Sequence, residues 1–253
     1  LGFLTLFSLL SCSGEKSHIC PPCGRTCDQL SFETAGPCPE CGMDLEPGTP
    51  SAINAISISE GSGSFIIEGG PGREDAAIQV FYHRPRSWTK NSPVLLVIPG
   101  AGRNGDRYRD AWIETSEAHS VLVLSPVYPA SNYDFAAYHM GGTIASLKIQ
   151  GTPIGEVRPS SRKWQLEDTD LTFDISEDKS RWLFNDFDRI FDAARESLGA
   201  TQTSYDIFGH SAGGQILHRL AIFYPETKAK RIIAANAGFF TLPDSETPMP
   251  FGL

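Results

Sequence analysis

A short glycine-rich segment late in the chain has the pattern of a catalytic nucleophile. Gly209-His210-Ser211-Ala212-Gly213 places a serine two residues from a glycine on each side, which is the spacing G-x-S-x-G. A serine in this pattern sits on a sharp, strained turn between a strand and a helix, and the glycines leave room for it. The N-terminus of the helix behind it favours negative charge. We therefore interpret Ser211 as a nucleophile that attacks an acyl carbon.

Two backbone N–H groups are expected to hold the negative charge that develops on the attacked oxygen. The first is the N–H of Ala212, because it directly follows the nucleophile. The second is expected from the loop Gly100-Ala101-Gly102, whose glycines let the backbone approach a substrate. We assign this second donor to Ala101.

A group of cysteines forms a second candidate site. All six cysteines of the 253-residue chain lie within its first 41 residues. Cys20 and Cys23 form one C-x2-C pair, and Cys38 and Cys41 form another. Two such pairs complete a tetrahedral site of four thiolates, and closed sites of this kind are usually structural zinc. We predict zinc, or another soft metal, on these four residues.

The ligand set and the state of the thiols have alternatives. Gly36-Pro37-Cys38-Pro39-Glu40-Cys41-Gly42-Met43 resembles the end of short heavy-metal-binding segments in bacterial envelope and copper-handling proteins. The first half of the cysteine segment, around Cys20 and Cys23, departs from that pattern, so Cys27 or His18 could replace one ligand. A pair of disulfides is a further alternative, because an exported chain meets an oxidising compartment.

The N-terminus resembles an export signal. Residues 1–10 are apolar and uncharged, and ten residues are too few to span a bilayer, which needs about 20. Leu9-Leu10-Ser11-Cys12 resembles the lipobox of bacterial lipoproteins. The resemblance implies a lipid on the Cys12 thiol and a place in the cell envelope, on the periplasmic side or at the outer membrane. The chain starts at Leu1 without a positive region, so we expect its true start to be missing.

Composition excludes several classes of protein. Apolar residues make up 40% and charged residues 20%, with a mean hydropathy of -0.18. These values exclude a disordered chain and a polytopic membrane protein. The net charge of -9 and the pI of about 5.1 argue against general nucleic-acid binding.

From residue 64 onward, predicted strands and helices alternate. Residues 93–98 form a continuous apolar run, as expected of a strand buried on both faces. This alternation predicts an α/β fold with a mostly parallel sheet flanked by helices. Residues 129–178 show no clear periodicity, and we expect them to be irregular. Further strands are expected at 121–124, 205–208 and 231–235, with helices at 182–198 and 212–224.

The domain prediction follows from these segments. We expect a truncated signal peptide at 1–12, a metal-binding module at 18–46, a linker at 47–63, and an incomplete α/β domain at 64–253.

The large domain resembles the α/β-hydrolase family, in particular bacterial esterases of the polyhydroxybutyrate-depolymerase and feruloyl-esterase type. The resemblance rests on three segments and covers residues 64–253. It implies an acyl-enzyme mechanism with no cofactor. The segments are Leu96-Val97-Ile98-Pro99-Gly100, Tyr205-Asp206-Ile207-Phe208-Gly209-His210-Ser211-Ala212-Gly213 and Ala235-Asn236-Ala237-Gly238-Phe239-Phe240-Thr241-Leu242-Pro243-Asp244.

The family's order of serine, acid and histidine is not completed on this chain. His218 is the last histidine, and its place on the same helix points it away from Ser211. Asp244 is a weak candidate acid, and a turn residue is its simpler interpretation. We expect the acid and the base beyond residue 253. His139, with its aromatic neighbours Tyr133, Phe135 and Tyr138, either lines a substrate pocket or anchors a surface loop.

The favoured function is therefore hydrolysis of carboxylic esters, either small or polymeric, through an acyl-enzyme on Ser211. A serine peptidase of the same fold is one alternative. A metal-binding lipoprotein with a non-catalytic hydrolase domain is another. The expected partners are the substrate and a membrane reached through Cys12, with no nucleic acid.

Overall fold

The computed structural model describes residues 18–20, 27, 31–47, 56–150, 152–158, 161–165 and 171–253. The chain divides into two compact units, Leu1–Asn54 and Ala55–Leu253. The predicted signal peptide with Cys12 lies outside the described residues. Within the described part of the chain, no helix combines the length and the apolar character needed to cross a membrane.

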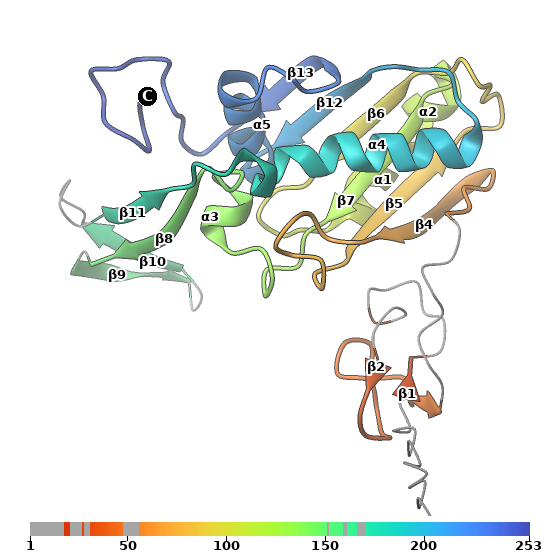
Figure 1. Ribbon diagram of the computed structural model, residues 1–253, viewed down its shortest axis with the longest axis horizontal. Helices are drawn as coiled ribbons and strands as arrows, with labels where there is room; N and C mark the ends of the chain where they lie inside the picture. Colours follow the sequence, from red (N-terminus) through yellow and green to blue (C-terminus); the bar gives the residue numbers. More distant parts are fainter. Residues whose placement is uncertain are drawn as a thin grey trace, which may run out of the picture. The chain divides into compact units, whose positions relative to one another are not determined.

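A six-stranded sheet forms the centre of the large unit (Figure 1). In spatial order its strands are β13 (Ala229–Ala235), β12 (Tyr205–His210), β6 (Val94–Ile98), β7 (Leu122–Val127), β5 (Ile78–Arg84) and β4 (Gly61–Ile67). β12 runs parallel to β13 and β6, and β6 runs parallel to β7. β5 pairs antiparallel with both β7 and β4. The prediction of a mostly parallel sheet is confirmed.

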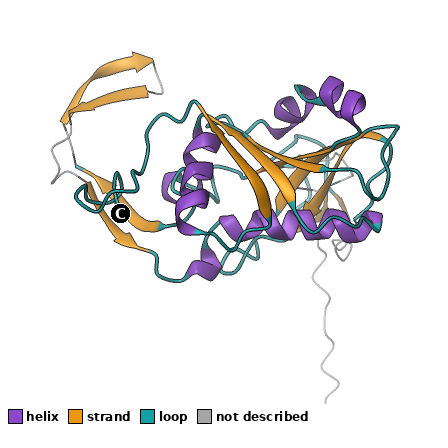
Figure 2. Cartoon of the chain, turned by 90° about the horizontal axis from the view of Figure 1, so that it is seen from above, coloured by secondary structure: helices purple, strands orange, loops and turns teal. Residues whose placement is uncertain are grey.

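Helices cover both faces of this sheet (Figure 2). α1 (Gly105–Asp110) and α2 (Ile113–His119) lie on one face, and α4 (Phe184–Leu198) lies on the other beside α5 (Ala212–Phe223). α4 and α5 contact each other where the Tyr224 hydroxyl donates to Asn185 Oδ1 at 2.7 Å. Because both faces are covered, the apolar run of β6 is buried, with Leu96 and Ile98 fully enclosed. The sheet with its flanking helices is the α/β-hydrolase fold predicted from the sequence.

The stretch at 129–178 is more regular than expected. It contains α3 (Phe135–Tyr138) and two antiparallel hairpins. One hairpin joins β8 (Ile144–Ile149) to β11 (Leu171–Ile175), and the other joins β9 (Thr152–Arg158) to β10 (Ser161–Gln165). These strands lack a continuous apolar run, and bulges interrupt their pairing, so the sequence carries little strand periodicity.

The small unit contains a three-stranded antiparallel sheet. Its order is β2 (Ser31–Phe32), β1 (His18–Ile19) and β3 (Glu46–Pro47). Its apolar cluster consists of cysteines with Phe32 and Leu45 packed against them. A core this small contributes little folding free energy by itself.

A buried acidic residue lies on the inner face of α4. Asp186 Oδ1 accepts a hydrogen bond of 2.7 Å from the Arg189 guanidinium, and a Cβ on Gly70 would lie 2.7 Å from the same oxygen. Burial raises the pKa of Asp186 to about 6, although Arg189 opposes the rise. The protonated carboxyl is therefore favoured by the folded state.

We predict that Asp186→Asn removes a pH-dependent loss of stability. The Asp186 carboxyl keeps its proton to a higher pH in the folded protein than in the unfolded chain. The stability that this proton contributes is therefore present below about pH 4 and is lost as the pH rises through 6. The loss for this one group is roughly 3 kcal/mol at neutral pH. Urea unfolding at pH 4 and pH 7 should show the asparagine variant gaining stability relative to wild type. If the unfolding free energies of the two proteins differed by the same amount at pH 4 and at pH 7, this account would be contradicted.

Candidate active site and cysteine cluster

Ser211 lies on a strained turn between β12 and α5, as predicted. Its φ of 57° and ψ of -115° fall in a region that costs a residue with a side chain on the order of 1–3 kcal/mol. The Ser211 N–H donates to the carbonyl of Ala235 at 3.0 Å, which ties the turn to the end of β13. The surrounding backbone therefore holds this residue in an unfavourable conformation.

Three glycines around the turn are required by close backbone contacts. A Cβ on Gly209 would lie 2.4 Å from the carbonyl oxygen of Gly213. A Cβ on Gly213 would lie 2.2 Å from that of Ile98, and one on Gly214 would lie 2.5 Å from that of Ala235. The predicted need for glycine is confirmed. The contacts with β6 and β13 involve segments that are distant in the sequence.

The loop after β6 reaches Ser211. A Cβ on Gly100 would lie 3.3 Å from Ser211 Cβ, so the backbone of this loop passes directly beside the serine. The Arg103 N–H donates to the Gly100 carbonyl at 3.0 Å and closes a turn around Ala101. Ala212 is the first residue of α5 and is buried. The two expected oxyanion donors thus belong to segments that flank Ser211.

Tyr108 is a neighbour of the Ser211 turn that the sequence did not reveal. Its hydroxyl lies 3.0 Å from His210 Nδ1, and a Cβ on Gly100 would lie 3.0 Å from that hydroxyl. Tyr108 therefore contacts both the turn that carries the serine and the loop beside it. No motif marks this tyrosine, because only the docking of α1 against the sheet brings it to Ser211.

His218 does not face Ser211, as expected. Its Nδ1 hydrogen-bonds with the Gly214 carbonyl at 3.1 Å, and its Nε2 accepts the Thr241 N–H at 2.8 Å. Burial lowers the pKa of His218, which keeps the ring neutral and tied to the backbone.

Asp244 has the contacts of a turn residue. Its carboxylate accepts hydrogen bonds of 2.8 Å from the Glu246 N–H and from the Thr247 hydroxyl. These bonds lower the pKa of Asp244, with the Glu246 N–H as the largest cause. The simpler interpretation of this residue is supported.

Two of the aromatic residues near His139 belong to the core. Tyr133 and Tyr138 are fully buried, and their hydroxyls donate to the carbonyls of Ala76 and Pro99. Both therefore anchor this segment against the sheet. His139 stacks on the exposed Phe135 ring with the centroids 4.4 Å apart, and its Nδ1 lies 2.8 Å from the amide oxygen of Gln215 on α5.

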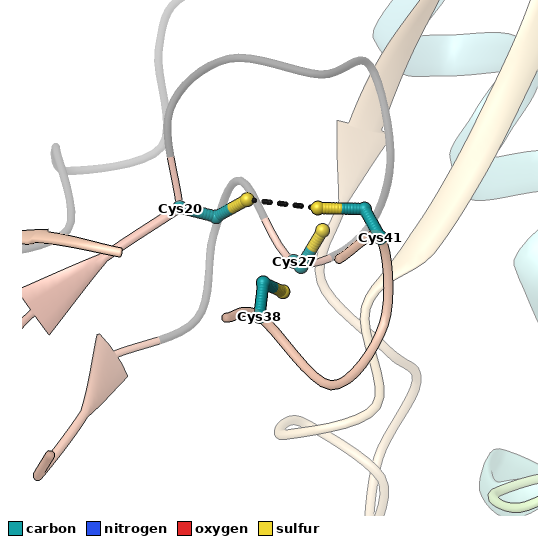
Figure 3. Close-up of side chains that lie close together, drawn as sticks. All are labelled: Cys20, Cys27, Cys38 and Cys41. Atoms are coloured by element: carbon teal, nitrogen blue, oxygen red, sulfur yellow. Dashed lines mark hydrogen bonds between the residues drawn. The ribbon is translucent and has the colours of Figure 1, made fainter. Parts of the chain in front are cut away.

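Four cysteines of the small unit lie close together (Figure 3). The Sγ atoms of Cys20, Cys27, Cys38 and Cys41 all lie within 4.8 Å of one another. The Cys20 and Cys41 sulfurs are 3.2 Å apart, and none of these four cysteines forms a disulfide. Three members of the predicted ligand set are thus brought together with Cys27, which the sequence left as an alternative. Cys23 lies outside the described residues.

The chemistry of this cluster fits a soft metal ion. A hydrogen bond with the Met43 backbone, followed by one with Cys20, lowers the pKa of Cys41 to about 7. The thiolate form, which is the form that binds metals, is therefore accessible near neutral pH. Four such sulfurs could hold one ion in tetrahedral geometry.

Comparisons with solved structures identify relatives of the large unit, whereas no protein-family model and no curated protein matches the chain. Poly(aspartic acid) hydrolase-1 from Sphingomonas sp. KT-1 aligns at 32% identity with a TM-score of 0.61, over 78% of this chain and 64% of that one. LpqC, a poly(3-hydroxybutyrate) depolymerase from Bordetella parapertussis, aligns at 26% identity with a TM-score of 0.59, over 77% and 58%. The chain therefore spans less than two thirds of either relative.

We predict that Gly213→Ala destabilises the fold by more than about 2 kcal/mol, because the new methyl group would overlap the Ile98 carbonyl. Gly238→Ala is the matched control, since its methyl group would meet only the end of the Gln215 side chain. Thermal unfolding of both variants checks the prediction. Equal melting temperatures for the two would show that the contact between α5 and β6 is not rigid.

Proposed function

We propose that this protein is a serine hydrolase and that Ser211 is its nucleophile. The observation that carries the proposal is the strained Ser211 conformation, held between β12 and α5 with the Gly100 loop directly beside it. Strain of this kind persists only where the surroundings impose it, and it is concentrated at functional sites. The two structural relatives, which are named as a hydrolase and a depolymerase, support the same reaction class.

The proposed mechanism uses the backbone on both sides of the serine. Ser211 Oγ attacks the substrate carbonyl carbon, and the N–H groups of Ala212 and Ala101 stabilise the resulting oxyanion. Collapse of this intermediate expels the alcohol and leaves an acyl-enzyme, which water then hydrolyses. No cofactor is required.

The general base is proposed to be a histidine outside these 253 residues. The ring of His210 is hydrogen-bonded to Tyr108, and both ring nitrogens of His218 are engaged by backbone groups. A base must reach the proton that it removes from the serine hydroxyl. Both ring nitrogens of His218 and the Nδ1 atom of His210 are therefore engaged by groups other than Ser211.

The proposed substrates are carboxylic esters, either small or polymeric. One relative is named for a polymer of a hydroxy acid, which supports ester cleavage. The other is named for a polymer of an amino acid, which keeps a peptidase of the same fold as the second candidate. Comparing nitrophenyl esters with dipeptide anilides distinguishes the two.

The small unit is proposed to bind zinc as a structural ion. Four thiolates leave no open coordination position, which suits a structural role better than a catalytic one. The ion would supply folding free energy that the small apolar cluster lacks.

We predict that Ser211→Ala abolishes covalent labelling of the complete gene product by a fluorophosphonate probe. Hydrolysis of a short-chain nitrophenyl ester should fall at least about 1000-fold, because the nucleophile is lost. Ser131→Ala, at an exposed loop serine, should keep both activities. Wild-type protein that is never labelled would favour the alternative of a metal-binding lipoprotein with a non-catalytic domain. Robust serine-dependent turnover by the 253 residues alone would contradict the proposed source of the base.

We also propose that a lipid on Cys12 anchors the protein in a bacterial cell envelope. The support is the lipobox-like segment Leu9-Leu10-Ser11-Cys12. Metabolic labelling with a lipid precursor should mark the wild-type protein and not Cys12→Ala. Equal labelling of the two proteins would overturn this proposal.

A further inference from the structure

The four clustered thiols converge from separate pieces of the small unit (Figure 3). Cys20 directly follows β1, whereas Cys38 and Cys41 lie on one hairpin turn. Cys27 comes from the stretch between β1 and β2, and its sulfur lies within 4.8 Å of the other three. In a tetrahedral zinc site with Zn–S bonds of about 2.3 Å, the sulfurs are separated by roughly 3.8 Å. The cluster is therefore close to the size of a metal site.

The hairpin holds two of these sulfurs on one side of the cluster. The Gly42 N–H donates to the Cys38 carbonyl at 2.8 Å, and the Cys38 N–H donates to the Met43 carbonyl at 2.7 Å. Gly42 has a φ of 79°, a conformation that favours glycine. This C-x2-C segment thus behaves as the sequence predicts.

The other side of the cluster does not follow the C-x2-C spacing. Cys27 is the most deeply buried of the four cysteines, with 0% of its surface exposed, compared with 3% for Cys20 and 2% for Cys38. Among the described residues, Phe32, Leu45 and Cys41 pack against the cluster, so Cys27 is buried mainly beside other thiols. A shared metal ion accounts for a thiol in this position.

We infer that the metal is held by Cys20, Cys27, Cys38 and Cys41, and that the ion does not require Cys23. The first half of the site then has a C-x6-C spacing in place of the C-x2-C pair. A closed shell of four thiolates leaves no position for a fifth sulfur. This inference rests on the proposal that the small unit binds a metal.

The test compares Cys27→Ser with Cys23→Ser in the full chain, purified under reducing conditions. Bound zinc is measured by elemental analysis and native mass spectrometry, and cobalt substitution reports thiolate ligation through its absorption spectrum. The wild type and Cys23→Ser should each bind one equivalent of zinc. Cys27→Ser should lose at least about tenfold in bound zinc, because one ligand is missing.

A second readout uses alkylation of the zinc-loaded wild type followed by peptide mapping. Iodoacetamide should modify Cys23 without releasing the metal, while the four ligand thiols react only after chelation. Zinc loss in Cys23→Ser with retention in Cys27→Ser would overturn the ligand assignment, and so would full retention in both variants. Wild-type protein that holds disulfides and no metal would instead overturn the underlying metal proposal.

Discussion

The turn that carries Ser211 depends on one close contact between two backbones. Gly213, at the start of α5, lies so near the Ile98 carbonyl at the end of β6 that no side chain would fit. Parallel pairing aligns Gly209 of β12 with Ile98, so both strands end at the same level of the sheet. That register places the serine turn beside the Gly100 loop, and the remainder of the proposed site is built around this junction. Ligands in α/β sheets bind at such carboxyl ends of strands.

The helix behind the serine is fixed by contacts with the segment around α3. Gln215 bonds to His139, and the buried Arg219 guanidinium donates to the carbonyls of both Gln215 and His139. Burial lowers the pKa of Arg219 to about 10, and its guanidinium carbon lies 4.7 Å from the Phe239 ring centroid. These contacts join three segments that are distant in sequence, so contacts with the other two segments set the orientation of α5.

Several elements could be predicted because their signals are local. The apolar run of β6, the buried stripe of α4 and the glycines around Ser211 are each written in a few consecutive residues. The hairpins between residues 144 and 175 were missed because their pairing is bulged and lacks an apolar run. Tyr108 was missed for a different reason, because its contact with His210 spans more than 100 residues.

Short-range spacing of residue types was enough to predict the proposed nucleophile, the α/β class and a cysteine-rich unit. The folded chain was needed to show which groups surround Ser211 and which backbone groups bond to the His218 ring. It was also needed to show that Cys27 joins Cys20, Cys38 and Cys41. These arrangements arise from contacts between separate segments of the chain, which form only when the chain folds. The spacing of residues along the sequence does not predict which side chains will contact one another in the folded protein.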